Sequence, residues 1–436
     1  MPGRETARPI LLKNARVIDP ACGLDDAHGG VLIENGFIAA AGTGVDTVPE
    51  GGETIDCAGA IVCPGLIDMR VFVGEPGAEH RETLASASKA AAAGGITTLV
   101  MMPDTDPVID DVALVDFLLR RARDTASVRV EPMAAITRGL KGEEMTEFGL
   151  LAEAGAVAFT DGRHSIRNAQ VMRQALTYAR NFDALIVHHP EDRDLVGHGV
   201  MNEGETATRL GLPGIPREAE SVIVARDMRL ARLTGGRYHA AQISCADSLD
   251  AIRRAKEEGL AVTCGVSVNH LTLNEFDIGD YRTFFKLSPP LRGEDDRLAM
   301  VRGLAEGLID VVVSAHDPQH VETKRHPFAE AADGAIGLET LLAAGLRLVH
   351  AGECNLATLL RALTSAPAGL LGLDRGTLAR GAAGDVVVFD PERPWVCEEA
   401  GIVSRSKNTP FEGARFQGQV LRTLVAGHTV YEYAGA

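Results

Sequence analysis

The middle of the chain alternates short apolar runs with amphipathic stretches. Each apolar run is rich in Val, Ile or Ala and is short enough to be one buried strand. The runs cover residues 65–73, 96–102, 128–137, 156–161, 184–189, 237–244, 261–268 and 310–317. The helical stretches between them include residues 82–95, 168–182, 218–236 and 248–259. Eight strands that alternate with helices predict an α/β fold of the (β/α)8 barrel type, and Ser248 is the expected cap of the last of these helices.

The two ends of the chain have a different pattern. Residues 9–65 and 384–433 carry short runs of Val, Ile and Leu separated by Gly, Asn and Asp, which is typical of antiparallel strands. We expect the ends to pair into one small β-sandwich. The expected domains are therefore the barrel, residues 64–371, and a β-domain made from residues 1–63 and 372–436.

Charge and composition narrow the classes of function. The 436 residues include 43 basic and 60 acidic side chains, a formal net charge of −17. Nucleic acid and anionic lipid are therefore not expected as partners, because both need a basic surface. No apolar run is long enough to span a membrane. The seven scattered cysteines contain no Cys-x-x-Cys pair, which fits a reducing cytoplasm rather than a disulfide framework.

Candidate chemistry lies at the carboxyl ends of the predicted strands, where barrels of this type carry their active sites. The first strand reads "PGLIDMRVFVGEPG" over residues 64–77. Side chains two apart in a strand point to the same face, so Asp68, Arg70 and Phe72 are expected to share one. This polar face leads into a glycine-containing turn at the predicted barrel mouth.

At these strand ends the chain resembles the dihydroorotases, a family of cyclic amidohydrolases. The resemblance extends over nearly the whole chain. It rests on stretches such as "PGLIDMRVFVGEPGAEHRET", "AAAAGGITTLVMMPDTDPVIDD", "FKLSPPLRGEDDR", "GLIDVVVSAHDPQHVETKRHPF" and "SRSKNTPFEGARFQGQV". It implies a barrel with a β-domain from both chain ends. It also implies the opening of the dihydroorotate ring, or the reverse closure of carbamoyl aspartate, in pyrimidine synthesis.

The resemblance implies zinc, which would activate a water molecule and polarise the amide carbonyl. Four of the six ligand positions have changed. Arg70 and Phe72 replace the two histidines of the family's first strand, Gln242 replaces the second histidine of His-x-x-His, and Ala315 replaces the catalytic aspartate. Only two ligand positions keep their residues, Asp161 and His189. We therefore expect no metal cofactor.

Positions that hold the substrate in the family have changed as well. Asp104 stands where the family has an asparagine, and its charge would repel an anionic substrate. The family's Asn-Pro-Pro-Leu-Arg loop begins here with Ser288. Of the expected substrate contacts, only His316 remains.

Several of these side chains have two interpretations. Asp161 and His189 could still hold one ion with help from His164, His188 or Asp317, but leftover polar groups in a partly wet cavity are the favoured interpretation. Arg70 could anchor a substrate or neutralise Asp161, and we favour the second, with a contact of about 3 Å.

The remaining candidates favour a structural role. Phe72 most simply fills the space of the missing zinc pair, although it could instead line a new aromatic pocket. His239 and His316 are expected to be hydrogen-bonded structural histidines, and Cys264 a buried inert thiol.

Three functions remain open. The first is a catalytically inactive, dihydroorotase-like protein that acts as a structural partner of aspartate transcarbamoylase, a role that the resemblance implies. The second is an active dihydroorotase or related cyclic amide hydrolase with a reduced or relocated zinc site. The third is a binding module that senses a pyrimidine intermediate. A homo-oligomer is compatible with each of them.

Overall fold

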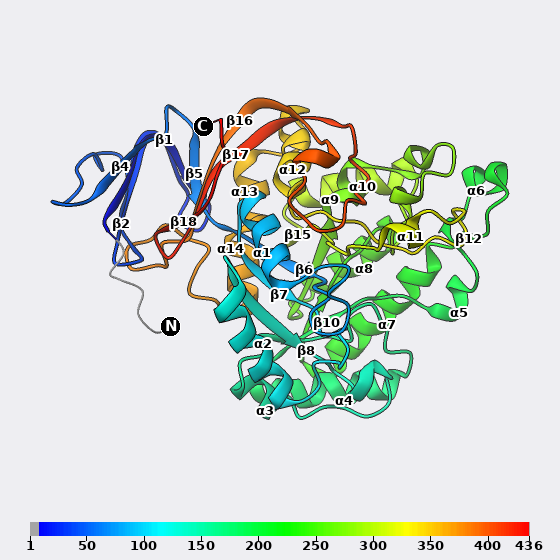
Figure 1. Cartoon of the computed structure of the whole chain (residues 1–436). Helices are drawn as coiled ribbons and strands as arrows, with labels where there is room; N and C mark the ends of the chain where they lie inside the picture. Colours follow the sequence, from blue (N-terminus) through cyan, green and yellow to red (C-terminus); the bar gives the residue numbers. More distant parts are fainter. Residues whose placement is uncertain (1–7, 436) are drawn as a thin grey trace.

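The computed structural model describes residues 8–435, so the first seven residues of the predicted segment 1–63 lie outside the described part. Eight parallel strands form a nearly closed barrel in the order β15-β14-β13-β10-β9-β8-β7-β6 (Figure 1). Their bounds are β6 Leu66–Val71, β7 Ile96–Met101, β8 Arg129–Ala134, β9 Ala158–Phe159, β10 Leu185–His188, β13 Arg237–Ala240, β14 Val262–Ser267 and β15 Val311–Val313. Every strand lies within its predicted run, and the barrel prediction is confirmed.

The barrel closes where its first and last strands meet. Val71 forms a parallel bridge with His316, and the Phe72 amide donates to the His316 carbonyl at 2.9 Å. The strands fill the interior with a cluster that includes Met69, Phe72 and Val313. A register shift between Asp68 and Val71 breaks strict alternation in β6, so Met69 and Phe72 pack in one cluster. Phe72 therefore packs with Met69, a residue that simple alternation placed on the opposite face.

Helices surround the barrel (Figure 1). The longer ones are α1 Leu84–Ala93, α2 Val112–Thr125, α4 Ala169–Ala179, α7 Glu218–Thr234, α8 Ala246–Glu257, α10 Glu294–Ala305, α12 Leu341–His350, α13 Leu356–Leu363 and α14 Ser365–Leu371. Shorter ones are α3 Phe148–Glu153, α5 Arg193–Val196, α6 Glu205–Leu210, α9 Val268–Thr272 and α11 Val321–Lys324. The predicted helices are confirmed with one correction. α8 begins two residues earlier than expected, with Cys245 at the cap position and Ser248 buried inside the helix.

The two chain ends form one eight-stranded sheet. It contains β1 Ile10–Asp19, β2 Leu24–Glu34, β3 Phe37–Gly42, β4 Glu53–Asp56, β5 Ile61–Pro64, β16 Val386–Val396, β17 Arg415–Val425 and β18 His428–Glu432. The ends join where β5 pairs antiparallel with β16. Val31, Val62, Val386 and Leu424 from both ends share one core, which confirms the predicted β-domain. A separate two-stranded sheet, β11 Met201–Asn202 and β12 Gly214–Ile215, lies on the barrel side.

Candidate functional site at the barrel mouth

The carboxyl ends of the barrel strands meet around one small cavity. It is lined by Arg70, Gln242, Asn269, Leu287, Ser288, Ala315, Asp317 and Gly334. Three sequence-predicted residues, Arg70, Gln242 and Ala315, are therefore brought together as expected. Only about 10 Å³ of the cavity is open to the centre of a water molecule, which is room for roughly one water. A ring-shaped substrate does not fit in this space.

Two arginines hold Asp317 at the mouth. Arg81 Nη2 lies 2.5 Å from Asp317 Oδ1, and Arg163 Nη1 lies 2.9 Å from Asp317 Oδ2. Arg163 also reaches Asp104, at 3.3 Å. Asp104, the acid that sequence analysis found in place of an amide, therefore has a cation as its partner. The nearby charges of Asp317 and Asp104 raise the pKa of Arg163.

Phe72 lies beneath these arginines. Its ring is 3% exposed, and the Arg81 guanidinium carbon lies 4.1 Å from the ring centroid. The Arg163 guanidinium carbon is 5.6 Å away on the same ring. These distances are within the range of cation–π contacts. Phe72 therefore fills the mouth, as the favoured interpretation expected, with one arginine directly over its ring.

The predicted contact between Arg70 and Asp161 is wrong. Asp161 accepts from Thr137 instead, from the backbone amide at 2.9 Å and from the hydroxyl at 2.5 Å. Within residues 8–435, neither Nε nor Nη2 of Arg70 has a hydrogen-bond partner. Burial lowers the pKa of the Arg70 guanidinium, and the charges of Asp317 and Asp104 act in the opposite direction. Thr137 follows the neighbouring strand β8, and its hydroxyl hydrogen-bonds the Asp161 carboxylate. This bond takes the place of the predicted pairing with Arg70.

Two buried carboxyls keep unusually high pKa values. Burial raises the pKa of Asp161 to about 6, although the two bonds from Thr137 oppose it. Burial also raises the pKa of Asp68 to about 6, against bonds from the amides of Arg70 and Ser314. For both carboxyls, burial disfavours the charged form more than the hydrogen bonds favour it.

His189 and Gln242 have unused polar atoms. His189 is 2% exposed, and neither of its ring nitrogens has a hydrogen-bond partner in the described chain; Nε2 lies 3.8 Å from Glu191 Oε2. The Gln242 amide nitrogen lies 3.4 Å from His270 Nδ1, and its carbonyl oxygen has no partner among the described residues. Buried polar groups are normally paired, so these atoms have hydrogen-bonding capacity that the described side chains do not use.

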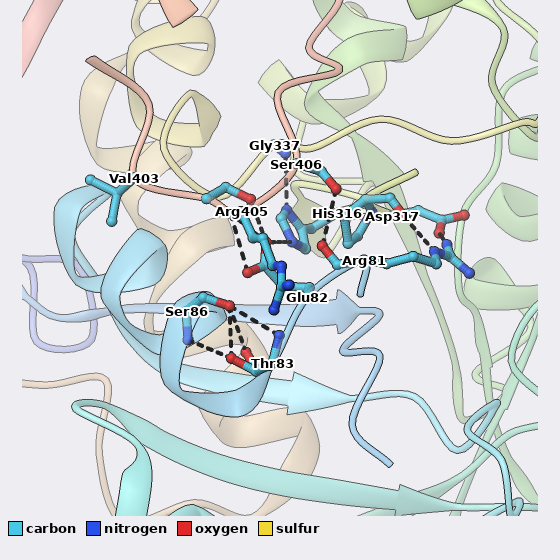
Figure 2. A network of polar contacts seen from close by, with 12 residues as sticks. Arg81, Glu82, Thr83, Ser86, His316, Asp317, Gly337, Val403, Arg405 and Ser406 are labelled. Atoms are coloured by element: carbon cyan, nitrogen blue, oxygen red, sulfur yellow. Dashed lines mark hydrogen bonds and ion pairs between the residues drawn. The ribbon is translucent and has the colours of Figure 1, made fainter. Parts of the chain in front are cut away.

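His316 does not line the cavity. Its Nδ1 accepts from the Gly337 amide at 3.2 Å, and its Nε2 lies 3.7 Å from Glu82 (Figure 2). Glu82 also binds Ser404 and the Arg405 amide, which come from the C-terminal segment. Burial acts to raise the pKa of Glu82, but His316 and Ser404 lower it below its ordinary value. His316 therefore joins the barrel to the C-terminal segment, which agrees with the favoured interpretation of a hydrogen-bonded structural histidine.

The other candidate histidines also have structural partners. His188 Nδ1 lies 2.7 Å from Asp227, and its Nε2 accepts from the Ile166 amide at 2.9 Å. His239 bonds Thr263 at 2.8 Å, and burial lowers its pKa to about 3. For the Cys264 thiol, burial raises the pKa to about 12, so this thiol stays protonated and inert at neutral pH. The structural interpretation of His239 and Cys264 is confirmed.

The residues present do not fit a zinc ion at the family's position. No group of three or more His, Cys, Asp or Glu side chains converges anywhere in residues 8–435. Both Asp161 oxygens are held by Thr137, and Asp317 is held by two arginines. A zinc site needs three or four converging donors, and neither a phenyl ring nor a methyl group supplies one. His164 bonds Arg193 and does not join Asp161.

Arg81 and Arg163 are the site residues that sequence analysis missed. Arg163 follows Asp161 by two positions, so the strand-end logic that selected Asp161 could also have found it. Arg81 lies ten residues beyond β6, in the loop before α1, and no spacing rule places its side chain over Phe72. An arginine side chain is long and flexible enough to extend from a loop to the barrel mouth. The position of such a side chain cannot be predicted from the periodicity of the sequence.

The family model and the similar proteins of known sequence both point to the dihydroorotases, and a similar solved structure is a hydantoinase. The family model described as "Dihydro-orotase-like" matches residues 59–248. A protein named dihydroorotase from Pelobacter propionicus is 44% identical over 422 residues, 97% of this chain and 99% of that protein. One of the same name from Citrifermentans bemidjiense is also 44% identical, with the same coverage. Among solved structures, the L-hydantoinase (dihydropyrimidinase) from Arthrobacter aurescens has a TM-score of 0.87 at 25% identity, covering 97% of this chain and 96% of that chain.

Proposed function

Since the chain belongs to the dihydroorotase family, we propose that it is a member that has lost the ring-opening reaction and acts as a structural partner of aspartate transcarbamoylase. The observation that carries the proposal is the barrel mouth. Arg70, Phe72, Gln242 and Ala315 stand at four ligand positions, and the space between the strand ends holds roughly one water.

The rest of the molecule supports the same proposal. The barrel, its helices and the end sheet are complete, and the changes gather at the strand ends. A fold that is kept while its chemical groups are replaced still offers an outer surface to a partner. The protein would work in the cytoplasm, where its seven cysteines, all free in the structure, stay reduced. The described residues contain no helix with the length and apolar character needed to cross a membrane.

Zinc content and turnover test the loss of activity. We would express the chain in zinc-supplemented medium, purify it beside the dihydroorotase from Pelobacter propionicus, and measure bound zinc and hydrolysis of dihydroorotate. We expect far less than one zinc per chain and no rate above a heat-treated sample. A rate that a chelator removes and zinc restores would refute the proposal and support the alternative, an active cyclic amide hydrolase, which the high identity to proteins named dihydroorotase favours.

Co-purification tests the partnership. Aspartate transcarbamoylase from the same organism would be co-expressed with this chain, and the Pelobacter protein would serve as a bait of the same fold. We expect the transcarbamoylase to elute with this chain and not with the control. If it elutes alone at full activity, and deletion of this chain leaves pyrimidine synthesis intact, the structural role is wrong.

A further inference from the structure

A second cavity lies between the barrel and the end sheet, away from the cavity at the barrel mouth. It is bounded on the barrel side by the segment before α12 and the start of that helix, and on the other side by β16, β17 and β18. About 230 Å³ of it is open to the centre of a water molecule, against about 10 Å³ at the barrel mouth. An apolar cavity of roughly 150 Å³ binds benzene, so this one has room for an aromatic ring with a substituent. Clefts between domains are common ligand sites.

The walls are mainly apolar and aromatic. Trp395 from β16 and Tyr431 from β18 line the sheet side, and Leu338 and Leu342 line the barrel side. The Trp395 indole is held in place, because its Nε1 donates to the Gly418 carbonyl at 2.8 Å. The Trp395 ring also packs against Phe416, with ring centroids 5.1 Å apart, so two aromatic side chains of one sheet supply fixed apolar surface to a flat or cationic ligand.

The charged groups of the lining have a single sign. Glu339 and Glu398 line the cavity, and no Lys, Arg or His is among its lining residues. Both Glu339 oxygens are fixed in place by backbone amides, Val403 at 2.7 Å and Ser404 at 2.9 Å. Burial raises the pKa of Glu339, and the two backbone amides and the charges of His316 and Lys407 oppose that shift. Glu398 is exposed at the rim.

We propose that this cavity binds a small organic cation with an apolar or aromatic body. The ammonium group would lie near Glu339 and pair with its carboxylate, and the body would pack between Trp395 and Leu342. Aromatic rings beside a carboxylate are a combination that recognises organic ammonium groups. An anionic ligand of the same shape would meet two carboxylates and be excluded.

The protein contains its own reporter of binding. Trp395 is the single tryptophan of the 436 residues, so tryptophan emission reports on this cavity alone. The probe is para-nitrobenzylamine, a cation at neutral pH whose nitrophenyl ring quenches tryptophan. Its uncharged and anionic counterparts of matched size are para-nitrobenzyl alcohol and para-nitrobenzoate. Free N-acetyltryptophanamide, titrated in parallel, corrects for absorption by the probes.

We expect saturable quenching by the amine at a concentration about tenfold lower than for the alcohol, and no saturation with the benzoate. Equal quenching by all three compounds, or quenching by the amine that never saturates, would overturn the proposal. A half-saturation point that rises with protein concentration beyond simple depletion would mean that a second copy of the chain occupies the cavity instead, and would also overturn it.

Substitutions locate the site. Gly401 is an exposed residue of the cavity lining, and a Cβ at Gly401 meets no atom within 4 Å, so Gly401→Phe adds a ring at the rim of the cavity without a clash. Gly369→Phe is the matched control, because its Cβ is equally free and the residue lies outside this cavity. We expect Gly401→Phe to abolish saturable quenching and Gly369→Phe to leave it unchanged. Quenching that survives Gly401→Phe would refute the assignment.

Two further variants test the charge. Glu339→Gln should weaken binding of the amine about tenfold and leave binding of the alcohol unchanged. Glu339 also holds the backbone of the C-terminal segment, so that variant is accompanied by Glu398→Gln, which alters only an exposed rim residue and should weaken the amine two- to threefold at low salt. If neither variant separates the amine from the alcohol, the carboxylates do not recognise the cation and the proposal is wrong.

Discussion

Asp161 provides a direct test of whether the barrel mouth works without a metal ion. Asp161 is 1% exposed, and its two carboxyl oxygens accept from the backbone amide and the hydroxyl of Thr137. Burial raises its pKa from the ordinary 3.8 to about 6. The folded state therefore holds a proton that the unfolded chain releases at lower pH. The stability from this group is fully present below about pH 4 and is lost as the pH rises through about 6.

The magnitude follows from the two pKa values. A difference of roughly two pKa units corresponds to about 3 kcal/mol of destabilisation at neutral pH, which is an upper bound. Asp161→Asn removes this charge and keeps the shape. The amide oxygen of Asn still accepts from the Thr137 backbone amide, and its NH₂ group donates to the Thr137 hydroxyl oxygen. We expect the variant to be more stable than the parent by about 1–3 kcal/mol at neutral pH and by nearly nothing below about pH 4.

Denaturant unfolding at several pH values between about 4 and 8 measures this difference. The matched control is Asp317→Asn, a second buried carboxylate at the same mouth that is held by Arg81 and Arg163. That variant should be destabilised by about 3 kcal/mol, because it removes the carboxylate charge that Arg81 and Arg163 share. If Asp161→Asn is less stable than the parent at neutral pH, Asp161 has a cation beside it, either a bound metal ion or an arginine, and the reasoning fails.

Two further predictions concern the arginine cluster and the lost ligands. Arg81→Met should destabilise the fold by about 2–3 kcal/mol in denaturant unfolding, because it removes one of the two arginines paired with Asp317, and adding Asp317→Asn should recover part of the loss. Restoring the family's ligands should raise zinc affinity by at least about tenfold in a competition assay with a chromogenic chelator. The restored variant carries Arg70→His, Phe72→His, Gln242→His and Ala315→Asp. A folded variant that binds no more zinc than its parent would mean that the strand ends are aligned wrongly.

Much of the fold could be predicted because its signals are local and repeated. Each barrel strand is a short apolar run, and hydrophobic burial depends little on which partner supplies the contact. The pairing of the two chain ends also followed from composition, because strands with unpaired edges need neighbours. The helix boundary at Ser248 was wrong because several polar residues compete for a cap position. Tertiary packing placed the start of α8 at Ala246, and Ser248 became a buried residue.

The site could be predicted only as far as the backbone determines it. Strand ends converge in any barrel, so Arg70, Gln242 and Ala315 were found together. The partner of Asp161 was not found, because the choice between an arginine and a threonine hydroxyl depends on differences of about one ångström between neighbouring strand ends. The contacts of long side chains were still harder to predict. Arg81 contacts Phe72 from a loop whose sequence has no periodic pattern.

Ala315 has a backbone conformation that is unusual for its side chain. Its φ of +53° places it in the left-handed region, where an alanine costs roughly 1–2 kcal/mol more than in an ordinary conformation and where Asp and Asn are enriched. The family resemblance puts the catalytic aspartate at this position. Strained conformations persist at functional sites because the surrounding structure fixes them. Here the neighbouring bonds remain: the His316 carbonyl still accepts from Phe72, and the Asp317 amide still donates to Ala335. The strand end therefore keeps a conformation that suits an aspartate while it carries a methyl group, and returning Asp at this position should not strain the backbone.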